Sequence, residues 1–283
     1  MTPTLVAARA GVARGLIEIR QMLTNGQDLF MQYFWPVVIL VVLFFMRDSS
    51  FGDTGIGLGA LALPGVVGML VASSGIMGIA QFLSVDREDG TLLRAKATPN
   101  GMVGYLIGKI ITSAGTLLVQ VIVMLAAGAF IVGGLHLDNV GAWVTLIWAF
   151  VLGVLATLPM GAVFGSIFDN PRNVGFAMMP VMGLIAVSGI FYPITSMPGW
   201  IQGLAQVFPI YWLGLGMRSA LLDGDAAVVE LGRSWRHWET FGVLSIWTVA
   251  GLALAPIVLR RMARRESGSS VAARREKAMQ RAY

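Results

Sequence analysis

Long stretches of the chain carry no Asp, Glu, Lys or Arg, and they are the strongest structural signal in the sequence. They cover residues 29–46, 54–85, 110–137, 139–168, 173–217 and 240–259. A helix of about 20 apolar residues crosses the hydrocarbon core of a bilayer. The pattern predicts an all-α integral membrane protein whose transmembrane domain, residues 29–259, has crossings near 30–46, 60–83, 108–132, 143–167, 174–192 and 241–259.

The run from Asn173 to Met217 is too long for one crossing, and the positions of the charges indicate how it folds. Both termini are rich in arginine, and basic residues mark the cytoplasmic ends of membrane proteins. Two cytoplasmic termini require an even number of crossings, here six. We therefore expect residues 194–216 to enter from outside and turn back as a re-entrant helical hairpin. The residues that mark this hairpin are Pro193, Pro198, Gly199, Trp200, Pro209 and Tyr211.

Composition supports a membrane protein and excludes several other classes. Hydrophobic residues make up 56% of the chain and charged residues only 12%, whereas soluble proteins are about 25% charged. The absence of cysteine excludes disulfide frameworks and thiolate metal sites, and the two histidines lie far apart, so we expect no metal site. Uninterrupted apolar runs do not alternate as barrel strands do. We interpret the pI near 10.0 as a topology signal and expect no nucleic-acid partner.

We expect a cytoplasmic segment before the transmembrane domain in the sequence and another after it. In the first, residues 1–28, a helix over 5–23 would place Leu5 and Leu16 on an apolar face and Glu18 opposite, which predicts a helix in the membrane interface. It would be either a passive anchor or a moving part. The second, the basic tail at 260–283, is expected to be a solvated anchor, and the alternative is that it binds anionic lipid or a soluble partner.

The densest internal cluster of charges lies between the second and third predicted crossings, in a cytoplasmic loop at residues 84–103. Gly90 breaks this segment, Thr91 can cap a short helix, and Pro99 closes it. A short cytoplasmic helix of this kind can present apolar and charged side chains to a partner in the cytosol. The candidate contact residues are Asp86, Arg87, Glu88, Asp89, Gly90, Thr91, Leu92, Leu93, Arg94, Thr98 and Pro99.

Two segments resemble the type-2 ABC exporter permeases, the membrane subunits of daunorubicin-type drug-efflux and lipid or polysaccharide exporters. The first matches that family's cytoplasmic loop through Gly90, Thr91, Thr98 and Pro99. The second runs from Ser188 to Trp200 and is similar to the pattern S-G-x-F-x-P-x-x-x-x-P-x-W. Six crossings with both ends in the cytoplasm fit the same family.

This resemblance implies a multi-pass subunit of the bacterial plasma membrane that is not itself an enzyme. It implies a dimer of separate cytoplasmic ABC ATPase subunits that docks on residues 84–99 and on the amino-terminal interface helix and binds the ATP and Mg. It also implies a second copy of the chain, or a related permease, as the membrane partner. The chain itself would then hold no cofactor.

The sequence shows no energy source of its own. The phosphate-binding pattern G-x-x-x-x-G-K-[ST] is absent, because the only Gly-Lys pair, Gly108-Lys109, is followed by Ile110. We expect Lys109 to snorkel to the cytoplasmic interface. No predicted span interior holds a charged residue, which argues against proton coupling. The energy must therefore come from another subunit.

We expect the substrate path along the second and fifth crossings, since Met and Phe form adaptable apolar walls. The candidates are Met69, Ser73, Ser74, Met77, Met178, Met179, Met182, Ser188 and Phe191. The predicted function is export of a hydrophobic or amphipathic drug or lipid. Two alternatives stay open: an intramembrane enzyme acting on lipids, although no histidine or carboxylate is placed level with the serines, and a membrane scaffold or immunity factor that transports nothing.

Overall fold

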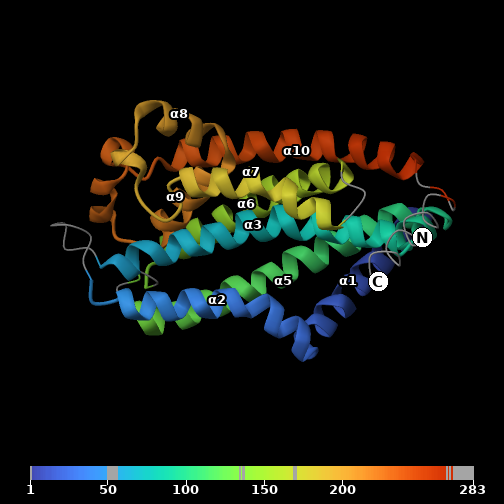
Figure 1. Cartoon of the computed structure of the whole chain (residues 1–283), viewed down its shortest axis with the longest axis horizontal. Helices are drawn as coiled ribbons and strands as arrows, with labels where there is room; N and C mark the ends of the chain where they lie inside the picture. The colour runs from blue at the N-terminus through green and yellow to red at the C-terminus, as the bar shows by residue number, and fades with distance from the viewer. Residues whose placement is uncertain are drawn as a thin grey trace.

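The computed structural model describes residues 2–49, 57–133, 135, 138–167, 171–265, 267 and 269, and every regular element in these ranges is helical. The long helices lie along one bundle (Figure 1): α2 Gly26–Met46, α3 Leu58–Glu88, α5 Gly101–Val132, α6 Val140–Ile167, α7 Pro171–Val187 and α10 His237–Arg265. Helices α1 (Pro3–Thr24) and α4 (Thr91–Lys96) lie at one end of the bundle, called the α4 end below. Helices α8 (Gly199–Val207) and α9 (Pro209–Leu221) lie at the other, the α9 end. The expected all-helical fold is confirmed.

Five of the long helices are long and apolar enough to cross a membrane: α2, α3, α5, α6 and α10. The expected fifth crossing, 174–192, falls on α7, which has only 17 residues. At 1.5 Å per residue α7 is about 25 Å long, short of the roughly 30 Å of a hydrocarbon core. The sixth crossing therefore remains a prediction, and most of the basic tail lies outside the described residues.

Helix α3 forms the centre of the bundle because small residues let α6 approach it closely. A Cβ added to Gly165 of α6 would come within 2.7 Å of the Ala80 Cα on α3, and Gly161 lies against the backbone of Ile76. Such contacts between small residues let membrane helices pack without gaps. Helices α5 and α9 cover further faces of α3, so most of its apolar residues are buried.

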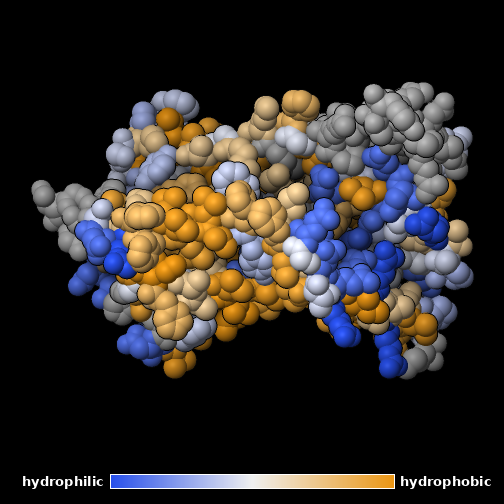
Figure 2. All heavy atoms as spheres, turned by 60° about the horizontal axis from the view of Figure 1, so that its bottom comes forward, coloured by the Kyte–Doolittle hydropathy of each residue, from blue (hydrophilic) through white to orange (hydrophobic). Residues whose placement is uncertain are grey.

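Helix α2 behaves in the opposite way and leaves most of its side chains on the surface. Val37, Val41 and Phe45 are exposed along its length. Figure 2, in which α2 is turned toward the viewer, shows a broad hydrophobic surface over the middle of the molecule and hydrophilic residues at both ends, more of them at the α4 end. An apolar surface of this kind suits contact with lipid chains rather than water.

At the α9 end, two short helices occupy the position of the expected hairpin. Helix α8 ends at Val207, and α9 begins at Pro209, where the fixed φ of proline suits the first turn of a helix. Nearly all residues of α9 are buried, since it packs against α3, α6 and α10. The two-helix shape agrees with the prediction for residues 194–216, whereas the depth of the hairpin in a membrane stays a prediction.

A buried ion pair fastens the α9 end. The Arg218 Nε lies 2.6 Å from the Glu230 Oε1, and the two side chains are 1% and 0% exposed. The same guanidinium donates to the carbonyl oxygens of Gly189 and Ile190, at 3.1 and 3.0 Å. Gly189 has φ +67, a conformation that glycine adopts without strain. Arg218 therefore holds the turn after α7 against α9 and the segment before α10.

We predict that Arg218→Met lowers the free energy of unfolding by about 3–5 kcal/mol, because it leaves the Glu230 carboxylate buried without its cation. Denaturant-induced unfolding of the purified protein in mixed micelles measures this loss. The control is Arg47→Met, which removes a partly exposed ion pair with Asp48 and should cost no more than about 1 kcal/mol. Equal stability of the two variants would contradict the proposed fastening role.

Candidate functional site

The segment with the first family motif forms a sharp elbow between α3 and α4. Helix α3 continues to Glu88, and the left-handed residue Gly90, with φ 78, turns the chain into α4. The Asp89 Oδ1 accepts a 2.7 Å hydrogen bond from the backbone N–H of Thr91. Gly90 rather than Thr91 is the N-cap of the short helix, with Asp89 accepting from the first helical N–H, and the Thr91 hydroxyl instead accepts from the Arg94 Nη2 at 2.8 Å. The expected loop at 84–103 is mostly helical.

The elbow presents only part of the predicted contact set to a partner. Arg94, Thr98 and Pro99 are exposed, together with Asp89, whereas Glu88, Thr91 and Leu93 are partly covered. Asp86, Arg87, Gly90 and Leu92 are buried within the chain. These buried residues can support the elbow, but Leu92 does not form the exposed apolar contact that we expected.

Helix α1 lies against the start of α5 and beside the elbow. The contact is close because glycines face each other: a Cβ on Gly15 would come within 2.9 Å of the Gly108 carbonyl oxygen, and Gly11 lies on Gly104 in the same way. A groove of about 470 Å³ lies between α1, α4 and α5. The apolar face of α1, including Leu5 and Leu16, points away from the bundle and is exposed.

Lys109 does not snorkel, contrary to our expectation. Its ammonium lies 3.1 Å from the Asp86 Oδ2 and 3.4 Å from the Glu18 Oε2, and its side chain is only 10% exposed. Two carboxylates from neighbouring helices lie within reach, so the ammonium is paired without extending to the interface. The sequence pattern does not indicate this cluster, because Glu18 and Asp86 lie 91 and 23 residues from Lys109 along the chain.

Glu18 stays ionised in this cluster. Burial raises the pKa of its carboxyl, but hydrogen bonds from Arg14 and Thr112 and the positive charge of Lys109 together outweigh that desolvation. The pKa of Glu18 therefore lies below its usual value. At neutral pH the carboxylate is available to pair with Lys109.

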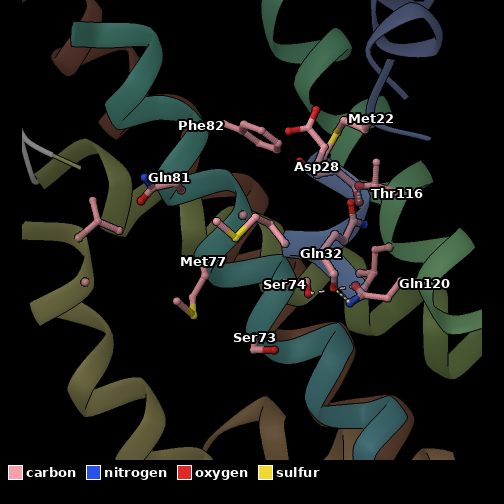
Figure 3. A pocket seen from close by; sticks show the side chains of 16 residues that line it. Met22, Asp28, Gln32, Ser73, Ser74, Met77, Gln81, Phe82, Thr116 and Gln120 are labelled. Carbon is pink, nitrogen blue, oxygen red and sulfur yellow. Dashed lines mark hydrogen bonds between the residues drawn. The ribbon is translucent and has the colours of Figure 1, made fainter. Parts of the chain in front are cut away.

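A cavity of about 590 Å³ opens between α1, α2, α3, α5 and α7, beyond the charged cluster (Figure 3). One part of its wall is apolar and flexible, with Met22, Met31 and Met77. Another part is polar and uncharged: Ser74 donates to the Gln120 Oε1 at 3.4 Å, and Gln120 in turn donates to the Gln32 carbonyl oxygen at 3.5 Å. The combination is suited to a ligand with both apolar and hydrogen-bonding surface.

The cavity brings together only some of the predicted path residues. Ser73, Ser74 and Met77 line it. Met69 instead packs against the core, and Ser188 is buried at the α9 end, where its hydroxyl donates to the Ile185 carbonyl oxygen. The exposed members that lie away from the cavity are Met179, Met182 and Phe191, and the side chain of Met178 lies outside the described residues.

Polar residues that we had not selected complete the cavity wall. They are Asp28, Gln32, Gln81, Ser113, Thr116 and Gln120. The Ser113 hydroxyl is buried and has no hydrogen-bond partner among the described residues. A signal was present in the sequence, since Ser113, Thr116 and Gln120 recur at helical spacing and share one face of α5. A search for Met, Phe and Ser on the second and fifth crossings passes over polar residues on the other helices.

The second motif lies at the α9 end, at a distance from the elbow (Figure 1). Pro193 and Pro198 flank a short 3-10 helix at Ile194–Ser196, and Gly199 begins α8. Trp200 is 72% exposed, whereas Tyr211 is fully buried and its hydroxyl has no partner in the described part of the chain. The two motifs thus occupy opposite ends of the bundle.

Comparison with known proteins identifies the family. The model of the ABC-2 family transporter proteins matches residues 17–257. The inner membrane transport permease YadH of Escherichia coli K12 is 28% identical over 238 residues, which cover 78% of this chain and 85% of YadH. The daunorubicin resistance ABC transporter permease protein DrrB1 of Streptomyces coeruleorubidus is 26% identical over 202 residues, which cover 70% and 69% of the two chains.

A further relative is the probable doxorubicin resistance ABC transporter permease protein DrrC of Mycobacterium tuberculosis CDC 1551, which is 23% identical over 233 residues, 80% of this chain and 83% of DrrC. The family match includes the elbow, the cavity and helices α8 and α9, and the resemblance seen in the sequence is confirmed. With its membrane-spanning helices, the chain belongs to the ABC-2 family of transporters and is a transmembrane permease subunit of an ABC transporter in a bacterial inner membrane.

Proposed function

We propose that the chain exports a hydrophobic or amphipathic substrate, a drug or a lipid, from the cytoplasm or the inner leaflet. ATP hydrolysis on a separate ABC ATPase dimer drives this export. The α4 end faces the cytoplasm with both termini, and six helices cross the membrane, with α7 as the fifth. The observation that carries the proposal is the placement of the cavity between an exposed charged elbow at one end and the hairpin at the other.

The elbow is the proposed docking point for the ATPase. Arg94 and Lys96 are exposed on α4, and the groove of about 470 Å³ beside them is walled by α1 and α5. A partner that enters this groove touches both α1 and α4. Movement of the ATPase can then reach the bundle through two helices, which gives α1 a mechanical role in addition to its place in the membrane interface.

The cavity is the proposed substrate site. Methionine side chains adapt to different apolar shapes, and the amide and hydroxyl groups opposite them can hydrogen-bond to a polar headgroup. A second permease, either a copy of this chain or a relative, is proposed to close the open side of the cavity. The exposed apolar faces of α2 and α10 contact lipid.

We predict that the double substitution Arg94→Glu and Lys96→Glu abolishes binding of the ATPase subunit. Both side chains are exposed, so the change reverses the charge of the docking surface and leaves the core of the bundle unchanged. Co-purification of the ATPase with the tagged permease in detergent measures the effect.

The matched control is Arg47→Glu with Arg233→Glu, two exposed arginines in the α9 half of the molecule. This variant should keep the ATPase. Retention of the ATPase by the α4 variant would show that the elbow is not the docking point, and transport by the permease alone without ATP would overturn the proposed function.

We predict that Gly78→Leu weakens binding of an amphipathic fluorescent dye at least about tenfold, which corresponds to about 1.4 kcal/mol. Gly78 lines the cavity, and a Cβ added there meets no atom within 4 Å, so the leucine fills the cavity without disturbing the helices. Fluorescence polarisation with the purified permease measures the affinity.

Gly242→Leu is the control, because Gly242 is also helical and unobstructed but lies in α10, away from the cavity. Both substitutions should raise helix stability slightly and by a similar amount. If they change dye binding equally, the cavity is not the binding site.

A further inference from the structure

The charged cluster at the α4 end is larger than a structural ion pair needs to be. Lys109 on α5 meets Asp86 on α3 and Glu18 on α1, and Arg14 adds a second cation 2.9 Å from the Glu18 Oε1. Well-packed apolar residues of similar volume are often as stable as such a buried group. Stability alone therefore does not account for the cluster, which joins three helices at one ammonium group.

We propose that Lys109 is a positioning residue that transmits movement of the elbow to the wall of the cavity. This inference rests on the proposed function, because it assigns a route between the ATPase docking point and the substrate site. The route leads from the elbow through Asp86 to Lys109 and from there to Phe82.

Lys109 holds α3 at two points one helical turn apart. Its Nζ lies 3.1 Å from the Asp86 Oδ2 and 4.8 Å from the centroid of the Phe82 ring, a cation–π distance. Asp86 and Phe82 are four residues apart and share one face of α3. One turn earlier on α5, the Tyr105 hydroxyl donates to the same Asp86 oxygen at 2.7 Å.

The two points on α3 face different parts of the molecule. Asp86 lies just before the Gly90 turn that leads into α4, and Tyr105 lines the groove between α1, α4 and α5. Phe82 lines the cavity (Figure 3), and its ring lies against the Lys109 ammonium. A displacement of α4 that moves Asp86 either carries Lys109 with it or breaks their contact, and in both cases the support of the Phe82 ring changes.

Helix α1 is joined to the same group. The Glu18 Oε2 lies 3.4 Å from the Lys109 Nζ and accepts a 3.0 Å hydrogen bond from the Thr112 hydroxyl. Separating a buried charge from its partner is costly, so intermediate positions with half-broken pairs are disfavoured. The cluster thus favours two discrete arrangements of α1, α3 and α5, which is what transmission between distant sites requires.

The experiment uses the permease in complex with its ABC ATPase in lipid nanodiscs and follows the cavity with one cysteine. The chain has no cysteine of its own, so Met77→Cys places a single thiol in the cavity wall. Its labelling rate by a water-soluble maleimide is measured without nucleotide and with a non-hydrolysable ATP analogue. In the Met77→Cys parent we expect the two rates to differ by about tenfold, a typical coupling between sites.

Added to this parent, Lys109→Met should reduce the ratio of the two rates to about one while the ATPase still co-purifies and hydrolyses ATP, and Lys109→Arg should retain most of the ratio. The matched control is Arg47→Met. Arg47 also combines an ion pair, to Asp48, with a cation–π contact, 4.3 Å from the Phe44 centroid, but outside the proposed route. It should leave the ratio unchanged.

Asp86→Asn provides a second variant if Lys109→Met does not fold, because it leaves the Lys109–Glu18 contact intact and should also lower the ratio severalfold. The inference is overturned if either variant keeps the ratio of labelling rates that the parent shows. It is also overturned if the labelling rate of the parent is the same with and without the nucleotide. Failure of the parent to bind any ATPase overturns the proposed function instead, so the two failures are distinguishable.

Discussion

The cost of burying charge governs how this bundle is assembled. A charge removed from water without a partner is expensive, so buried ionised groups must meet opposite charges before helices can close around them. In the described part of the chain, Lys109 meets Asp86 and Glu18 at one end of the bundle, and Arg218 meets Glu230 at the other. These pairs add fixed points to the apolar contacts between the helices.

Glycine makes the pairing at the α4 end geometrically possible. Helix α1 can approach α5 only where Gly11 and Gly15 face Gly104 and Gly108. That approach brings Glu18, which would otherwise point to the membrane interface, within reach of Lys109. Close packing and charge pairing thus depend on each other, since a larger residue on either helix would separate the charges as well as the backbones.

The sequence predicts the architecture well, because gaps between charges report directly on burial in lipid. Five helices long and apolar enough to cross a membrane, the two-helix shape of residues 194–216 and the family all follow from charge-free runs, prolines and two short motifs, whereas the elbow replaces an expected loop. The extent of α7 does not follow, because α7 ends at Val187 and the chain turns at Gly189, with φ +67, within the apolar run.

The candidate site is predicted less completely, because its chemistry depends on contacts between distant segments. Ser73, Ser74 and Met77 were selected by residue type and do line the cavity. The Glu18–Lys109 contact and the Gln32–Gln120 hydrogen bond join residues about ninety positions apart and leave no local pattern. The same reason explains why the sequence wrongly predicts that Lys109 snorkels. At the end of a span, a lysine whose partners are distant in the sequence has the same local pattern as one that extends to the interface.

The contact between Arg218 and Glu230 has a consequence for biogenesis. Its partners come from α9 and from the segment before α10, and it also binds the turn after α7. In the proposed topology these parts leave the ribosome one after another, and the pair cannot close until residue 230 has been translocated. Until then Arg218 has no carboxylate partner and stays hydrated. Closure of the α9 end is therefore a late event in membrane insertion.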